Sequence, residues 1–235
     1  MDTLFVFAHQ DDEIAFASRI RLCIARGDRV RCVYLTDGAS RVAASVRNNE
    51  SRRALATLGV TEVEFASVAA DGALPDHLED ALAALTPADE IYTLAWEGGH
   101  QDHDAAFVVA AAFADRHGIP CTELPLYNGD HTIGPLFRVN HPIGKGWTSR
   151  PITQREKLAN VLLTRFYRSQ RSTWLALAPL MLLAPAVEFT RAADLRRVSR
   201  PPHQGRLFYE RRFRYPYSRF AERAEAFLRR QSRRG

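Results

Sequence analysis

The first half of the chain alternates between two hydrophobic patterns. Short runs, most of them nearly all apolar, have the length and composition of strands buried in a parallel sheet. Between them, apolar residues recur at the three- and four-residue spacing of amphipathic helices. This alternation predicts a Rossmann-like α/β fold: a mostly parallel sheet with right-handed crossovers and helices on both faces. The predicted strands are residues 4–8, 30–35, 62–65, 91–95 and 122–126, and the predicted helices cover 14–24, 46–58, 78–85 and about 102–117.

The second half of the chain has weaker patterns. Residues 128–150 are rich in Gly, Pro, Asn and His, which predicts a loop or an irregular hairpin. Thr153 with Glu156 predicts the capped start of a helix, as Asp76 with Glu79 does earlier in the chain. The last half-dozen residues are expected to be disordered. The later helix is expected to bury Leu158, Leu162 and Phe166.

One apolar stretch, residues 174–187, is interrupted by Pro179 and Pro185. Spanning a bilayer takes about 20 apolar residues, so this stretch is too short for a transmembrane helix. We expect it to pack in the core, with a monotopic membrane contact as the alternative. The expected organisation is one domain over 1–235, with an α/β core over 1–127. A loop, a helix and an irregular basic C-terminal extension follow over 128–235.

Charge is distributed unevenly along the 235 residues. Residues 1–149 carry 12 Lys+Arg against 21 Asp+Glu, whereas residues 150–235 carry 20 against 6, and the net charge is +5. An acidic half suits cation binding. A basic half suits phosphate, an anionic glycolipid or a membrane surface, or it is simply a solvated basic face.

The cysteines and the N-terminus bear on location. Cys23, Cys32 and Cys121 are an odd set without metal-site spacing, which favours unpaired thiols in a reducing compartment. Residues 1–7 have an acid where a signal peptide carries basic residues, and their apolar run is short. We expect a cytoplasmic protein, with a peripheral location at the inner face of the membrane as the alternative.

Two acidic-histidine clusters carry most of the chemical information. His9-Gln10-Asp11-Asp12-Glu13 follows the first predicted strand, and His100-Gln101-Asp102-His103 follows the fourth. Ligands of parallel α/β sheets bind beyond the carboxyl ends of the strands, so both clusters lie where a site is expected. Two imidazoles and a carboxylate meet the need of a catalytic Zn²⁺ for three protein ligands and an open position for water. The sequence therefore predicts a metal site within residues 1–127.

The spacing within each cluster suggests roles. His9 and Asp12 are candidate metal ligands, while Asp11 points into the pocket. His100 and His103, three residues apart at a helix start, share one face, so one can bind metal while the other serves proton transfer or oxyanion stabilisation. Asp102 is a candidate to accept a hydrogen bond from an imidazole and fix its tautomer.

Other residues and motifs receive structural interpretations. No Gly-x-Gly-x-x-Gly follows the first strand, which disfavours a dinucleotide-binding enzyme. Aromatic residues interleave with arginines near the C-terminus, but a packed segment explains them as well as nucleic-acid binding does, and we expect no nucleic-acid partner. The remaining histidines are expected to be surface or core residues. These aromatics are Phe208, Tyr209, Phe213, Tyr215, Tyr217 and Phe220, and these histidines are His77, His117, His131, His141 and His203.

At the two clusters a family resemblance becomes specific. Ala8-His9-Gln10-Asp11-Asp12-Glu13 resembles the Ala-His-Pro-Asp-Asp-Glu signature of the PIG-L/LmbE-like zinc-dependent N-acetylglucosaminyl deacetylases, and residues 100–103 resemble that family's His-x-Asp-His motif. Thr36-Asp37-Gly38, Arg47-x-x-Glu50 and Leu58-Gly59-Val60 fit the family's order between them, and Tyr167-Arg168-Ser169-Gln170 is a weaker match. The resemblance covers about residues 3–127.

By that resemblance, His9, Asp12 and His103 are the zinc ligands. Asp11 is the general base, and His100 is its electrostatic or acid partner, protonated when it holds the oxyanion. Arg47 resembles a substrate-contacting arginine and Asp71 a sugar-hydroxyl acceptor. Arg47 has an alternative as a helix–loop ion pair, and Asp71 as a turn residue, while Glu13 and Glu50 are expected to brace the motifs. Gln10 stands where the family has proline, and we expect it to add a donor and an acceptor near the pocket.

The implied function is Zn²⁺-dependent removal of acetyl from an N-acetylated amino sugar in a glycoconjugate, with release of acetate. The partner is then an N-acetylated sugar-containing small molecule or glycolipid. The basic second half favours an anionic partner and would allow a peripheral membrane contact. Two alternatives stand beside this interpretation: a zinc hydrolase of another amide or ester, and a non-catalytic sugar- or membrane-binding module. The sequence carries no signal for the oligomeric state.

Overall fold

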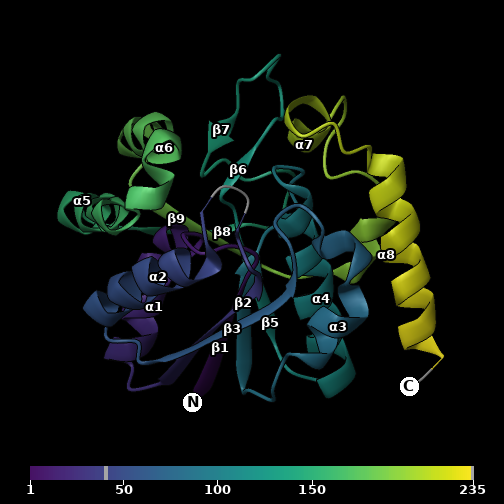
Figure 1. Cartoon of the computed structure of the whole chain (residues 1–235), viewed down its shortest axis with the longest axis horizontal. Coiled ribbons are helices and arrows are strands. Elements are labelled where there is room, and N and C mark those ends of the chain that lie inside the picture. The colour runs from purple at the N-terminus through teal and green to yellow at the C-terminus, as the bar shows by residue number, and fades with distance from the viewer. Residues whose placement is uncertain (40–41, 234–235) are drawn as a thin grey trace.

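The computed structural model describes residues 1–39 and 42–233, and within them one large sheet organises the protein (Figure 1). Its order is β3-β2-β1-β4-β5-β9-β8. The first five strands in that order are parallel, and β9 and β8 are added antiparallel at the edge. The strands are β1 Asp2–Phe7, β2 Arg29–Thr36, β3 Glu62–Ala69, β4 Glu90–Leu94, β5 Cys121–Leu124, β8 Thr148–Pro151 and β9 Val187–Ala192.

Strand β1 lies at the centre because its side chains are apolar on both faces. Leu4, Phe5, Val6 and Phe7 are at most 2% exposed, between β2 on one side and β4 on the other. Burial on both faces of the sheet removes the alternation of polar residues that a half-exposed strand shows. β1 and β4 therefore end side by side, and the loops that follow them meet at one edge of the sheet.

Helices cover both faces of the sheet, and the predicted Rossmann-like α/β fold is confirmed. In Figure 1, α1 and α2 lie on one side of the strands, and α3, α4 and α8 lie on the other. Both α2 and α4 end at a glycine with positive φ, Gly59 at 90° and Gly118 at 64°, a conformation that favours glycine. The bounds are α1 Glu13–Ala25, α2 Ala44–Leu58, α3 Leu78–Ala83, α4 Gln101–His117 and α8 Tyr217–Ser232.

Beyond β5, a short hairpin of β6 (Tyr127–Asn128) and β7 (Arg138–Val139) lies in the stretch expected to be a loop or irregular hairpin. The other elements beyond β5, apart from β8, β9 and α8, are α5 Gln154–Val161, α6 Arg171–Leu183 and α7 Phe208–Arg212, with 3₁₀ turns at Leu162–Phe166, Arg168–Gln170 and Leu195–Ser199. The hairpin, α6 and α7 lie toward the carboxyl edge of the parallel strands (Figure 1). Within the described ranges, no helix is long and apolar enough to cross a membrane.

Two predictions about the second half need correction. Thr153 does cap α5, but Leu158 and Leu162 are each 49% exposed, because the helix ends at Val161 and a 3₁₀ turn redirects the following residues. The apolar stretch 174–187 packs in the core only in part, with Leu177 and Met181 half-buried against it. Its Trp174 is buried, whereas four leucines of α6 are exposed.

Two further expectations fail at the C-terminal helix. The predicted capping box at Asp76 and Glu79 does not form, because a 3₁₀ turn at Leu74–Asp76 precedes α3 and both carboxylates face α8 instead. Asp76 pairs with Arg219 and Arg223, and Glu79 pairs with Arg230, two turns further along α8. Helix α8 continues to Ser232, so residues 230–232 of the tail that was expected to be disordered are helical, and residues 234–235 lie outside the described ranges.

The basic C-terminal segment is packed against the rest of the protein. Phe208, Tyr209, Tyr215 and Phe220 are at most 9% exposed, and Phe213 is the exception at 40%. The aromatic residues that alternate with arginines therefore fill the space beside α4.

Candidate metal centre and active site

The loops after β1 and β4 bring the two acidic-histidine clusters together. His9 Nδ1 lies 3.2 Å from His103 Nε2, although 94 residues separate them in sequence. Asp12 Oδ1 lies 3.2 Å from the same His103 nitrogen, and Asp12 Oδ2 lies 4.0 Å from His9 Nδ1. The second oxygen of Asp12 also accepts hydrogen bonds from the backbone N–H groups of Ala8 and His9, which fixes the carboxylate.

These three side chains fit a tetrahedral metal ion. Ligand atoms about 2.0–2.2 Å from one Zn²⁺ at tetrahedral angles lie roughly 3.4 Å apart, close to the separations among His9, Asp12 and His103. Two imidazole nitrogens and one carboxylate oxygen are also the donor set of many catalytic zinc sites. The predicted ligand residues are therefore neighbours in space, and their role as ligands stays a prediction.

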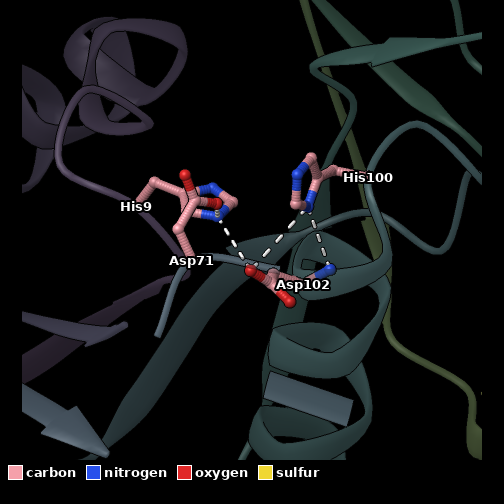
Figure 2. Close-up of side chains that lie close together, drawn as sticks. All are labelled: His9, Asp71, His100 and Asp102. Atoms are coloured by element: carbon pink, nitrogen blue, oxygen red, sulfur yellow. Dashed lines mark hydrogen bonds and ion pairs between the residues drawn. The ribbon is translucent and has the colours of Figure 1, made fainter. Parts of the chain in front are cut away.

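A second group of possible ligands also includes His9, but it lies beside the other ring nitrogen of that histidine, Nε2. It consists of His9, Asp71, His100 and Asp102. Figure 2 shows His9 and His100 on either side of Asp102, whose carboxylate at the start of α4 is directed toward His9. His9 Nε2 lies 3.0 Å from Asp102 and 3.2 Å from Asp71.

This second group is the poorer metal site. Both Asp102 oxygens already accept backbone N–H groups, from Gly72 at 2.6 Å and Leu74 at 3.1 Å. His100 Nδ1 accepts the backbone N–H of Asp102 as the N-cap of α4, so its lone pair is engaged. Asp102 is better placed to receive the Nε2 proton of His9 and to direct His9 Nδ1 toward His103, which is the contact predicted for it.

Ionisation in the group follows from burial and close charges. Burial opposes the charged forms, but His103 and His9 lower the pKa of the Asp12 carboxyl to about 2. Against the same burial, hydrogen bonds to Asp102 and Asp71 raise the pKa of His9 well above its ordinary value. The pocket thus holds fixed negative charge around imidazoles, which is the electrostatic setting of a cation site.

Asp11 lies in the cleft beside this group with a strained backbone. Its φ of 122° is one that side-chain-bearing residues rarely adopt. Arg47, 4% exposed, holds the loop: it donates to the carbonyls of Gly38 and Gln10 and lies 3.2 Å from the Asp11 carboxylate. Burial raises the pKa of Asp11 to about 7, although Arg47 opposes the shift.

Gln10 does not face the pocket, contrary to expectation. Its side chain is fully buried and donates to Asn48 Oδ1 at 2.8 Å and to the carbonyls of Thr36 and Asp37. The residue that replaces the family proline therefore ties the loop after β1 to β2 and α2. It adds no donor or acceptor to the cleft.

His100 is neutral in this setting. Burial, and then the nearby His9, lower the pKa of His100 to about 3. Because Nδ1 accepts a hydrogen bond, the single ring proton resides on Nε2. The ring also packs edge-on against Phe213, with centroids 4.5 Å apart. A protonated His100, as the sequence suggested, is therefore disfavoured by its surroundings.

Buried carboxylates brace both loops. Glu13 accepts the backbone N–H of Asp11, and Glu97 accepts those of Leu126 and Tyr127. Glu50 of α2 accepts the backbone N–H and the hydroxyl of Ser169, which joins the Arg47-x-x-Glu50 motif to the Tyr167–Gln170 segment. The expectation that Glu13 and Glu50 brace the motifs agrees with these contacts.

The cleft above the group has a volume of about 520 Å³. His9, Asp11, Asp12, Asp71 and His103 contribute to its lining, and aromatic and α6 side chains wall it. Sequence reasoning missed those walls, because they come from segments with weak periodicity that lie far from both motifs. The additional lining residues include Tyr127, Phe137, Phe208, Arg212, Phe213, Thr173, Ala176 and Leu177.

Comparison with known proteins shows which family and which structures this chain resembles. Residues 4–114 match the PIG-L family of GlcNAc-PI de-N-acetylases, and no curated protein matches significantly. A triple mutant of the deacetylase of the teicoplanin biosynthetic pathway shares the fold with a TM-score of 0.63 at 14% identity, over 82% of this chain and 97% of that one. N,N'-diacetylchitobiose deacetylase from Pyrococcus horikoshii gives 0.57 at 18% identity, over 86% and 84%.

The same fold also occurs in an enzyme of another class. GalB, the 4-carboxy-2-hydroxymuconate hydratase of Pseudomonas putida KT2440, gives a TM-score of 0.53 at 14% identity, over 83% of this chain and 97% of that one. At such identities the likeness shows the fold. The match over residues 4–114 shows more: the chain carries a PIG-L family domain, which confirms the resemblance drawn from the two motifs.

Proposed function

We propose that this protein is a metal-dependent hydrolase that removes the acetyl group from an N-acetylated amino sugar of the N-acetylglucosamine type. The observation that supports this proposal most directly is that His9, Asp12 and His103 converge in the cleft beside Asp11. The family match and the deacetylases that share the fold support the same reaction. Water adds across the amide C–N bond, and the products are acetate and a free amine.

The side chains divide the work. His9, Asp12 and His103 would hold Zn²⁺, which would polarise the acetamide carbonyl and lower the pKa of water to about 7. Asp11, whose raised pKa suits a general base, takes the proton of the attacking water and returns it to the leaving nitrogen as the C–N bond breaks. The neutral His100 donates its Nε2 hydrogen to the developing oxyanion. Arg47 positions Asp11.

The cleft also suggests how the acceptor is held. Asp71 is partly exposed at the cleft wall, where its carboxylate can accept a sugar hydroxyl. Arg212 and several aromatic side chains also line the cleft, which suits an anionic or partly apolar group attached to the sugar. Three free cysteines support a reducing location such as the cytoplasm, which cell fractionation checks.

Acetate release tests the proposal. Purified protein is assayed on N-acetylglucosamine, its phosphate, a nucleotide-linked form and a glycolipid form, after chelation and after return of Zn²⁺. We expect release only with metal. Asp11→Asn should lower kcat by at least about a hundredfold while zinc content stays near that of the wild type, since general base catalysis contributes on this scale. Equal loss of zinc would identify Asp11 as a ligand instead.

A second candidate is hydrolysis of another amide or an ester, because the fold also occurs in a hydratase. A panel of simple esters and non-sugar acetamides separates the two. Turnover confined to that panel would replace the sugar deacetylase, and protein that binds no metal would favour a non-catalytic module.

A further inference from the structure

The exposed apolar side chains are concentrated around the mouth of the cleft. Among the described residues, twelve large hydrophobic side chains are exposed, and seven belong to the β6–β7 loop, α6 or the end of α7. The same three segments supply cleft-lining residues. We call these seven residues the apolar rim: Ile133, Leu136, Leu175, Leu180, Leu182, Leu183 and Phe213.

Helix α6 gives the rim its main surface. Leu183 is 83% exposed and Leu175 is 69% exposed, whereas Trp174 faces inward. Ile133, at 79%, lies in the loop between β6 and β7, and β7 contacts α6. Scattered apolar residues are ordinary, but exposed apolar side chains concentrated in segments around one cleft mark an interaction surface.

Positive charge accompanies the rim. Arg165, Arg168 and Arg171 are exposed at the start of α6 and in the turns before it, and in the described ranges no carboxylate pairs with them. Over residues 153–187 five Lys+Arg face a single acid, Glu156, which pairs with Arg150. Arg212 and Arg214 add exposed charge on the opposite side of the cleft.

We propose that the apolar rim docks on an anionic lipid bilayer, with the mouth of the cleft toward the lipid. Leucine and isoleucine side chains would enter the interface between headgroups and acyl chains, and the arginines would contact anionic headgroups. A second copy of this chain fits less well, because a two-fold interface would bring the same arginines against each other. This inference rests on the proposed function in one respect: the orientation matters because docking brings the reacting site to acceptors carried by the bilayer.

Vesicle co-sedimentation tests docking without catalysis. The full chain is mixed with vesicles of phosphatidylcholine, or of phosphatidylcholine with phosphatidylglycerol. We expect binding to the anionic vesicles that weakens as salt is raised. Leu175→Ser with Leu183→Ser should reduce binding on the order of tenfold, because two leucines no longer enter lipid. Arg168→Gln with Arg171→Gln should reduce binding and its salt dependence.

Matched controls separate docking from general loss of surface residues. Leu22→Ser removes an exposed leucine of α1, and Arg116→Gln an exposed arginine at the end of α4, both away from the rim. Both should bind as the wild type does. Because Leu175 and Leu183 do not line the cleft, their variants should keep zinc content and any acetate release from soluble sugars.

Two results would overturn the proposal. One is wild-type protein that stays in the supernatant with both kinds of vesicle, or rim variants that bind as tightly as the wild type. The other is a dimer in sedimentation velocity that Leu175→Ser with Leu183→Ser dissociates, which would assign the rim to a second copy. Either result leaves the deacetylase proposal intact, since that is judged by metal and acetate.

Discussion

The two loops that meet at the site are built differently. The loop after β1 carries Asp11 at φ 122° and is held from outside, by Arg47 and by the buried side chain of Gln10. The loop after β4 relies on glycine: Gly98 has φ 71°, and a Cβ on Gly99 would meet the Tyr127 carbonyl at 2.1 Å. The first loop thus keeps a strained non-glycine residue with the help of side-chain tethers. The second loop uses glycines and is braced by a carboxylate, because Asp104 accepts the backbone N–H groups of Glu97 and Gly98.

Each loop nevertheless supplies a candidate ligand, so removing either should have the largest effect. His9→Ala and His103→Ala are each expected to weaken zinc binding on the order of a thousandfold and to abolish acetate release, since three protein ligands share the binding free energy. Zinc titration with a competing chelator measures this.

His117→Ala provides the control, because that histidine ends α4 away from the cleft. Its zinc affinity should equal that of the wild type. Unchanged zinc affinity in His103→Ala would mean that the loop after β4 contributes no ligand, and that the two loops do not share the metal.

The next effect distinguishes the two carboxylates near His9 Nε2. Asp102→Asn should weaken zinc binding about 10- to 100-fold, the usual loss when the partner of a metal-binding imidazole is changed. Asp71→Asn, at a partly exposed position, should instead raise KM with a smaller change in zinc affinity. The reverse order would mean that the metal lies on the Nε2 side of His9.

How much the sequence predicts also differs between regions. Up to β5 the fold and the site follow from local rules, since strands buried on both faces are nearly all apolar and parallel strands end at a common edge. The pairing of His9 with His103 needs only those rules and the strand order.

The remainder depends on contacts that no local pattern encodes. Asp76 and Glu79 satisfy the capping pattern, yet arginines of α8, more than 140 residues away, take both carboxylates. Gln10 was expected to add a donor and an acceptor near the pocket, but its side chain is buried against Asn48 and two backbone carbonyls. The exposed leucines of α6 are apolar in sequence, and apolarity alone suggests a core.

The tether of the first loop can be measured directly. Gln10→Ala should lower kcat about tenfold, with zinc affinity and KM nearly unchanged, because Asp11 loses its fixed position. Asn48→Ala should have a smaller effect, because it removes one of the three hydrogen bonds that Gln10 donates, and the double variant should be no worse than Gln10→Ala alone.

Gln10→Pro, which restores the family residue, should cost less than Gln10→Ala because proline stiffens the turn without the tether. Additive losses of kcat in the Gln10 and Asn48 double variant would mean that the two residues act independently. The tether would then not explain how the first loop differs from the glycine-based second loop.

The smallest effect concerns Glu97, which braces the second loop. Burial raises its pKa to about 8, so between about pH 4.5 and 8 the folded protein keeps a proton that the unfolded chain releases. This group therefore makes stability fall as pH rises, by at most about 1.4 kcal/mol per pH unit. Glu97→Gln should flatten that slope, at a cost of about 1 kcal/mol at low pH because its amide would face the Asn128 donor. Urea unfolding from pH 5 to 8 measures the slope of stability against pH. The control is Glu64→Gln at an exposed position, which should keep the wild-type slope.

An unchanged slope in Glu97→Gln would mean that the three donors around this carboxylate keep it ionised. The second loop would then be held by charge as well as by glycine.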